Sequence, residues 1–176
     1  GTLDGNGRTL QVGVSWNRTA GIFTHGSGTV EFTADGSVVN AETFFDLVKS
    51  GAGTLTGLGA NTTVAGDLAI MAGAALDTEG NDVAITGSLS NAGTLYREGG
   101  DTVSETDATG GTVVYRTTAG RIQDYAGNDY HDLEIAGAGL VFDQDAGLDV
   151  TGDLTIGAGS ELDTEGFDLV ITGSLA

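Results

Sequence analysis

LDTEGNDVAITGSL, at residues 76–89, returns as LDTEGFDLVITGSL at residues 162–175, and this pair of segments decides the fold. The match extends over residues 46–90 and 132–176, where 24 of 45 positions are identical at a constant offset of 86 and without a gap. Chance does not produce such a match. Self-similarity at a fixed period indicates a repeat architecture, in which each unit stacks on its neighbour.

A third, partial copy lies at the N-terminus. Residues 3–7 match residues 76–80 at an offset of 73, whereas residues 28–30 match residues 111–113 at an offset of 83. The difference places an insertion of about ten residues near positions 97–109, and we expect it to leave the stack as a surface loop or hairpin. The predicted organisation is a single segment, residues 1–176, with a partial first repeat (1–75), a full second repeat (76–161) and the start of a third (162–176).

Within each repeat the apolar residues alternate with polar or small ones, as in Leu68 and Ile70 or Val83 and Ile85. This period of two, in runs of a few residues separated by Gly, Asn or Asp, is typical of short half-buried strands. The chain has 31 Gly and no Pro. We therefore predict an all-β protein, a parallel β-solenoid (β-helix) built from 86-residue repeats. Each coil would take roughly 20–25 residues, so that one repeat fills three to four coils.

The alternative fold is a series of antiparallel β-sandwich repeats, because 86 residues is near the length of an immunoglobulin-like domain. Short strands and frequent glycines argue against it. One position departs from the solenoid pattern: Lys49 stands where the later copy has an inward-facing Ile135. Either the strand register slips there, or the Lys stem packs inward while its ammonium group finds water or a carboxylate.

The charge balance excludes several classes of protein. Asp and Glu number 25 against 6 Lys and Arg, which gives a formal net charge of -19, and there is no Cys. A nucleic-acid binder needs a basic face, and disulfide scaffolds, thiolate metal sites and cysteine nucleophiles need Cys. No apolar run approaches the length of a membrane span, so no membrane insertion is expected. Dispersed acids suit a salty or calcium-containing exterior, which favours an extracellular or cell-surface location.

The order of the motifs resembles a known group of proteins. Residues 21–23 and 28–32 are followed by Phe44-Phe45-Asp46-Leu47, by Gly66-Asp67-Leu68 and by the repeated segment at residues 76–89. This order is similar to the long β-strand-repeat surface proteins of bacteria, the filamentous-haemagglutinin-like and autotransporter-passenger β-helix adhesins. The resemblance implies a secreted or surface-displayed adhesin, stalk or fibre, and it brings no catalytic residues with it.

Two hypotheses of function follow. In the first, the chain is a structural or adhesive segment of a fibrous extracellular protein, a rigid rod or filament subunit. Its partners would be itself, through head-to-tail stacking or further repeats, and surface glycans. In the second, it is a glycan-binding or glycan-degrading β-helix of the tail-spike or lyase type. Such proteins line a groove with aromatic residues, but only 6% of this chain is aromatic and Trp16 is its single Trp. We therefore expect no enzyme and assign no catalytic residue.

The candidate metal ligands are Asp143, Asp145 and Asp149. The spacing D-x-D-x-G at residues 143–147 is typical of the start of a calcium loop, in which carboxylate oxygens gather around a tight Gly turn. A solvated strand edge is the alternative, because the matching positions of the earlier copy are Gly57, Gly59 and Thr63. Calcium is thus the candidate ion, and no other cofactor is expected. The repeated Asp-Thr-Glu-Gly at residues 77–80 and 163–166 is better explained by a required turn than by a ligand.

Overall fold

The computed structural model describes residues 1–58 and 60–176. Within that part the regular structure consists of short strands, and no described helix is long and apolar enough to cross a membrane. Every strand pair is parallel. The prediction of a parallel β-solenoid is confirmed, and the antiparallel sandwich is wrong. Gly59, the counterpart of Asp145 in the earlier copy, lies outside the described residues.

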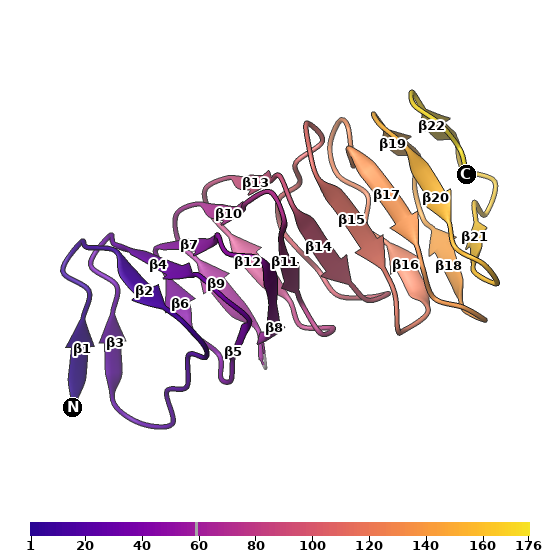
Figure 1. The fold of residues 1–176 in the computed structure, drawn as a ribbon. Helices are drawn as coiled ribbons and strands as arrows, with labels where there is room; N and C mark the ends of the chain where they lie inside the picture. Colours follow the sequence, from indigo (N-terminus) through magenta and orange to yellow (C-terminus); the bar gives the residue numbers. More distant parts are fainter. Residues whose placement is uncertain (59) are drawn as a thin grey trace.

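The chain winds as a three-sided coil into a rod whose two termini lie at opposite ends (Figure 1). Partner strands are about one coil apart: Leu47 pairs with Leu68, and Leu68 with Leu89. Layers spaced by the strand separation of a sheet make the rod about 35 Å long. Face 1 is a single unbroken sheet of seven strands, which in chain order are β5 (Gly36–Val38), β8 (Gly53–Leu58), β11 (Ala74–Asp77), β14 (Thr94–Arg97), β15 (Thr112–Tyr115), β17 (Asp132–Ile135) and β20 (Leu154–Ile156).

The other two faces are each divided into two sheets. Face 2 follows face 1 along the chain and contains β6 (Thr43–Phe44), β9 (Thr62–Val64) and β12 (Val83–Ile85), and then β16 (Gly120–Ile122), β18 (Val141–Gln144) and β21 (Glu161–Asp163). Face 3 contains β2 (Leu10–Val12), β4 (Thr29–Phe32), β7 (Asp46–Lys49), β10 (Leu68–Ile70) and β13 (Leu89–Asn91), and then β19 (Leu148–Val150) and β22 (Leu169–Ile171). A separate pair, β1 (Thr2–Asp4) and β3 (Ile22–Thr24), lies at the N-terminal end.

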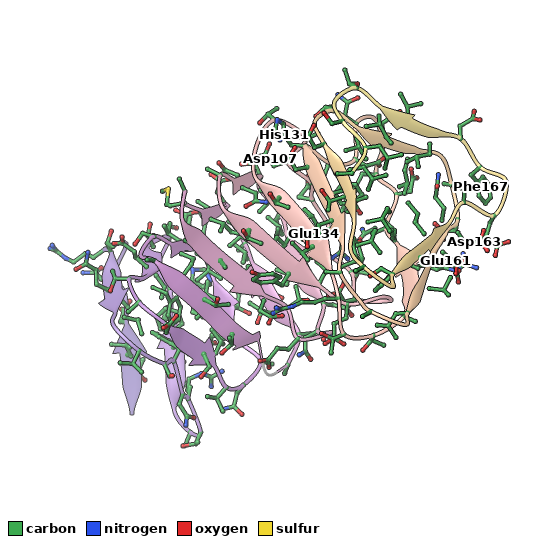
Figure 2. The ribbon with its side chains drawn as sticks, turned by 45° about the vertical axis from the view of Figure 1, so that its right-hand side comes forward. Asp107, His131, Glu134, Glu161, Asp163 and Phe167 are labelled. Carbon is green, nitrogen blue, oxygen red and sulfur yellow. The ribbon has the colours of Figure 1, made fainter. Side chains whose placement is uncertain are left out.

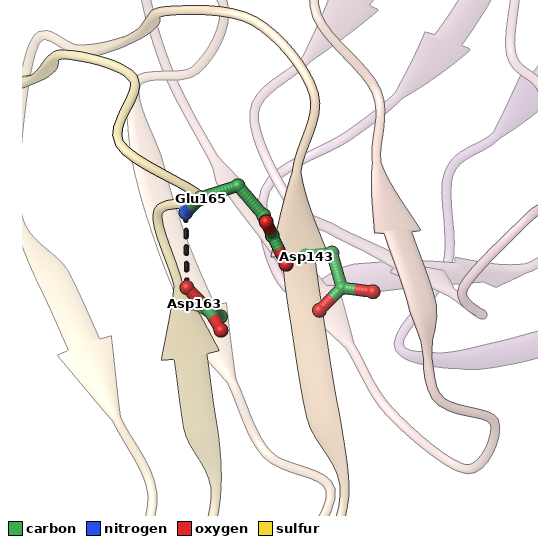
Figure 3. Close-up of side chains that lie close together, drawn as sticks. All are labelled: Asp143, Asp163 and Glu165. Atoms are coloured by element: carbon green, nitrogen blue, oxygen red, sulfur yellow. Dashed lines mark hydrogen bonds between the residues drawn. The ribbon is translucent and has the colours of Figure 1, made fainter.

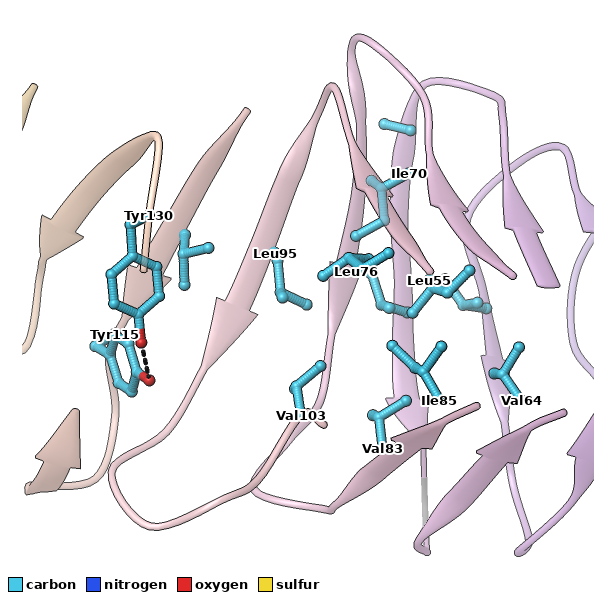
Figure 4. Close-up of a cluster of buried hydrophobic side chains, with 14 of the residues drawn as sticks. Leu55, Val64, Ile70, Leu76, Val83, Ile85, Leu95, Val103, Tyr115 and Tyr130 are labelled. Atoms are coloured by element: carbon cyan, nitrogen blue, oxygen red, sulfur yellow. Dashed lines mark hydrogen bonds between the residues drawn. The ribbon is translucent and has the colours of Figure 1, made fainter. Parts of the chain in front are cut away.

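One hydrophobic core runs along the inside of the rod. Alternate residues of each strand point inward, so register partners stack in columns; on face 1 Leu55 pairs with Leu76, and Leu76 with Leu95 (Figure 4). Lys49 keeps this register between Phe32 and Ile70 and is fully buried. Its Nζ donates a hydrogen bond to the carbonyl of Gly51, and burial lowers its pKa. The inward-packing alternative therefore holds and the register does not slip, but the acceptor of the ammonium group is a backbone carbonyl where water or a carboxylate was expected.

The repeated sequence segments do not lie on the same face. Strand β7, which begins the earlier copy, is on face 3, whereas its counterpart β17 is on face 1. The offset of 86 residues therefore spans four coils and one further face, not three to four coils. The coils between the copies are shorter than 21 residues: Leu95 pairs with Val113, 18 positions later. Because these coils are shorter, the same offset of 86 residues also takes the chain across one additional face.

The insertion near residues 97–109 does not leave the stack, so that prediction was wrong. Arg97 and Val103 are fully buried, and Val103 pairs with Val83 of the preceding coil. The segment is part of one of the short coils. The prediction followed the rule that insertions in solenoids go to the surface, but here Arg97, Asp101 and Val103 turn inward and complete a coil.

Candidate metal centre

The three predicted calcium ligands do not converge. Asp143 lies on β18 of face 2 and is partly exposed, whereas Asp145 forms an ion pair with Arg121 (2.6 Å) just after that strand. Asp149 is on β19 of face 3, and its backbone N–H donates to Asp129 (2.6 Å). Parallel winding carries the chain around a corner between Asp145 and Asp149, so the spacing that looks like a calcium loop does not close into one.

A different set of carboxylates does come together. Asp143, Asp163 and Glu165 each place a carboxylate oxygen within 4.8 Å of the others (Figure 3). They lie near the C-terminal end of face 2, where Asp163 and Glu161 are seen on the outer side (Figure 2). Carboxylate oxygens are the ligands that Ca²⁺ prefers. The cluster is largely exposed, so its like charges are also hydrated without an ion.

Two local features position these side chains. Asp143 and Asp163 are register partners in the parallel pair of β18 and β21, which sets their side chains one layer apart. Glu165 follows in a tight turn, where its φ is 51° and its N–H donates to Asp163 (2.9 Å). A spacing of one coil, about 20 residues, is the sequence signal that would have joined Asp143 to Asp163.

The same turn recurs in other copies without the cluster. The carboxylate of Asp77 accepts the N–H of Glu79 (3.0 Å), and that of Asp4 accepts the N–H of Asn6 (2.9 Å). The interpretation of the repeated Asp-Thr-Glu-Gly as a turn is confirmed, and in the later copy two residues of this turn, Asp163 and Glu165, also belong to the cluster. Asp77, however, faces Arg116 (2.5 Å), where Asp163 faces another acid. Arg116 lies two layers from Asp77, beyond β14, whereas Asp143 lies one layer from Asp163, so the side chains of the neighbouring layers decide whether the turn carries an ion pair or an acidic cluster.

Many of the other acids cap the corners of the coil. Oδ1 of Asp46 accepts the N–H of Asp67 in the next coil (3.0 Å), and Asp132 does the same for Asp153 (2.9 Å). Asp67 in turn accepts both the N–H and the hydroxyl of Ser88, and these bonds lower its pKa. The sequence analysis related the dispersed acids to a salty or calcium-containing exterior and missed this role, although an Asp recurring after 21 residues is its signal.

Five of the large aromatic side chains lie inside the core. Phe32, Phe44, Tyr115, Tyr130 and Phe142 are fully buried in the core, and the large aromatic that is most exposed is Phe167, at 45%. A hollow of about 770 Å³ lies at the N-terminal end and is lined by residues 1–3, 11–20, 22 and 23. It contains Trp16 packed edge-on against Phe23 with ring centroids 4.7 Å apart. These rings belong to the first layers of the core.

The fold and its repeated corners define the class of the protein as a parallel β-solenoid built from sequence repeats. No protein-family model matches the chain, and searches of the curated proteins and of the solved structures found no match.

Proposed function

We propose that the chain is a rigid segment of a secreted or cell-surface fibrous protein, in which it acts as a structural and adhesive rod. The observation that carries this proposal is the continuous architecture: one unbroken seven-stranded sheet and one core extend along the molecule. In a solenoid each layer is supported by hydrogen bonds to its neighbours, so a stack of layers keeps its direction over its whole length. Such a segment suits a stalk or fibre.

The surface chemistry supports the same proposal. The net charge of -19 keeps the sides of the rod hydrated and makes copies of the rod repel one another side by side. Specific contacts would then be made by the loops and by the end layers of the rod. The resemblance to bacterial β-helix adhesins points the same way. The inward position of the large aromatic rings supports a rod over a glycan-processing groove. We further propose that the partners are other repeats of the same protein, by head-to-tail stacking or in one chain, and surface glycans.

Two measurements on the whole chain test this proposal. Small-angle scattering should give an elongated particle of constant cross-section, and a maximum dimension that grows with concentration would support head-to-tail stacking. Beads coated with the chain should be retained on polysaccharide-coated surfaces without release of new reducing ends. A compact particle would contradict the rod, and the appearance of reducing ends would favour the glycan-degrading alternative.

A further inference from the structure

Two of the three hydrogen-bond ladders are interrupted at the same level of the rod. On face 2, Val103 pairs with Val83 below it, but the next strand, β16, pairs only with β18 above. On face 3, β13 ends its sheet, and pairing resumes only where Tyr130 meets Val150. On face 1, β14 and β15 pair without a break. This level, formed by residues 97–111 and 115–131, is called the junction layer below.

Side chains replace the missing rungs on face 2. The amide of Gln123 donates from Nε2 to the carbonyl of Val103 (3.0 Å) and accepts the N–H of Val103 at Oε1 (3.0 Å). It thereby supplies both bonds that a neighbouring strand would supply. The hydroxyl of Tyr125 also donates to the carbonyl of Val103 (2.9 Å). The backbone of Val103 is therefore satisfied although no strand pairs with it from above.

Face 3 is joined in the same way. The carboxylate of Asp107 accepts the N–H of Asn91 at the end of β13 (2.7 Å). From the other side, the hydroxyl of Thr151 donates to the carbonyl of Ala108 (2.8 Å). On faces 2 and 3 the contacts across this level thus come from side chains of particular residues, whereas face 1 keeps its backbone ladder.

Arg97 lies at the centre of the junction layer and is fully buried. Its Nε donates to Asp101 (2.9 Å), Nη2 to Gln123 (2.8 Å) and Nη1 to the hydroxyl of Tyr125 (2.9 Å). Its guanidinium group lies 5.1 Å from the centre of the Tyr115 ring, whose hydroxyl is 3.0 Å from that of Tyr130 (Figure 4). A buried guanidinium group is tolerated only where its donors and its charge are met, as they are here.

An apolar core does not choose between faces. Strands β7 and β17 both begin with Asp-Leu, and this Leu is buried on face 3 in β7 and on face 1 in β17. Leu, Ile and Val columns would therefore accept the second repeat in more than one rotation about the rod axis. A directional network is satisfied in one arrangement only, which is how a buried polar group specifies register.

We propose that the Arg97 network is a lock that fixes the one-face rotation between the two repeats and couples them into one folding unit. It is a conformational device of the fold and does not depend on the rod having an adhesive role. The prediction is that loss of the lock leaves residues 46–91 folded while residues 112–176 open separately. Loss of an ordinary buried contact would instead lower the stability of the whole chain.

Arg97→Met tests the proposal, with Arg116→Met as the control, because Arg116 carries the same charge near the same layer but pairs with Asp77 outside the core. Hydrogen exchange should rise at least about tenfold in residues 112–176 and stay unchanged in residues 46–91, with two unfolding transitions in place of one. The control should keep one transition. Uniformly raised exchange with a single transition, or no change, would overturn the proposal.

A second variant keeps the test decisive where Arg97→Met does not fold. Tyr125→Phe removes the hydroxyl that joins Arg97 to Val103 but keeps the ring in place. The same asymmetry of exchange between the two repeats is expected, at smaller amplitude. Equal exchange in both repeats of Tyr125→Phe would count against the lock.

Discussion

Residues 46–91 and the junction layer fill the inside of the same three-sided coil by different means. In residues 46–91 the coils are 21 residues long and the inward positions are mostly apolar, with Leu47, Leu55, Leu76 and Val64 fully buried. In the junction layer the coils are shorter, and Arg97 with its polar partners occupies the interior. Regular coils are thus held by backbone ladders and apolar columns that any face can provide. An irregular coil needs side chains that fit only one arrangement.

The largest expected effect is in the apolar stack. Leu76 is fully buried on face 1, so Leu76→Ala should destabilise the protein by about 3 kcal/mol, through lost burial and the cavity that remains. Leu162 is the same repeat position on face 2 and is only partly buried, so Leu162→Ala should cost clearly less. Urea unfolding of both variants measures the difference. Equal losses would show that the two copies are packed alike in spite of their positions.

The next effect concerns the corners, which the two copies share. A Cβ at Gly66 would lie 2.3 Å from Oδ1 of Asp46, and one at Gly152 would lie 2.2 Å from Oδ1 of Asp132. Gly66→Ala and Gly152→Ala should therefore each cost roughly 1–3 kcal/mol, by nearly equal amounts, because the clash is local to the corner. Thermal unfolding checks this. Unequal losses would mean that the face, and not the corner, controls the fit.

High pH should act on the junction layer. Burial raises the pKa of the hydroxyls of Tyr115, Tyr125 and Tyr130 above the ordinary tyrosine value. A group whose pKa is higher in the folded state than in the unfolded state stabilises the fold fully at pH values below its unfolded pKa, which is about 10 for tyrosine. This contribution is lost as the pH rises from that value through the folded pKa. The melting temperature should fall steeply above about pH 10, and less steeply in Tyr125→Phe. Parallel curves for the two proteins would argue that the tyrosines are not responsible.

Low pH should act on the corner carboxylates. Hydrogen bonds from Ser88 lower the pKa of Asp67, so its contribution is present above the unfolded value of about 3.9 and is lost as the pH falls through the folded pKa. Asp67→Asn keeps an oxygen acceptor for Ser88 but cannot titrate, so it should flatten the acid limb of the stability curve slightly. Acid titrations of both proteins, followed by circular dichroism, measure the change. An identical acid limb would assign acid unfolding to other carboxylates.

Salt and calcium should have the smallest effect. Like charges on a small rod repel at low ionic strength, so the melting temperature should rise with salt and with millimolar calcium. If Ca²⁺ occupies the cluster of Asp143, Asp163 and Glu165, Asp163→Asn should reduce the calcium increment, while Asp77→Asn, in the matching turn that faces Arg116, should not. A melting temperature that is flat from low to molar salt would contradict the prediction.

The sequence by itself determined the local parts of this protein. The alternation at Leu68 and Ile70 predicts an inward-facing strand, and the repeated Asp-Thr-Glu-Gly predicts a turn, because both depend on residues only a few positions apart. The parallel solenoid followed from the repeat. The calcium spacing at residues 143–149 failed to form a loop for the opposite reason: its oxygens would have to meet across a corner.

Only the tertiary structure decided which layers and faces meet. The face reached by a strand depends on the summed lengths of all preceding coils, so the short coils between Leu76 and Leu133 move every later strand by one face. No local signal records that sum. The summed coil lengths also decide that Asp163 lies beside Asp143, whereas Asp77 lies beside Arg116. They likewise place Arg97, Gln123 and Tyr125 together inside the rod. Local propensity determines the strands and turns, and the summed lengths of the coils determine which strands and turns become neighbours.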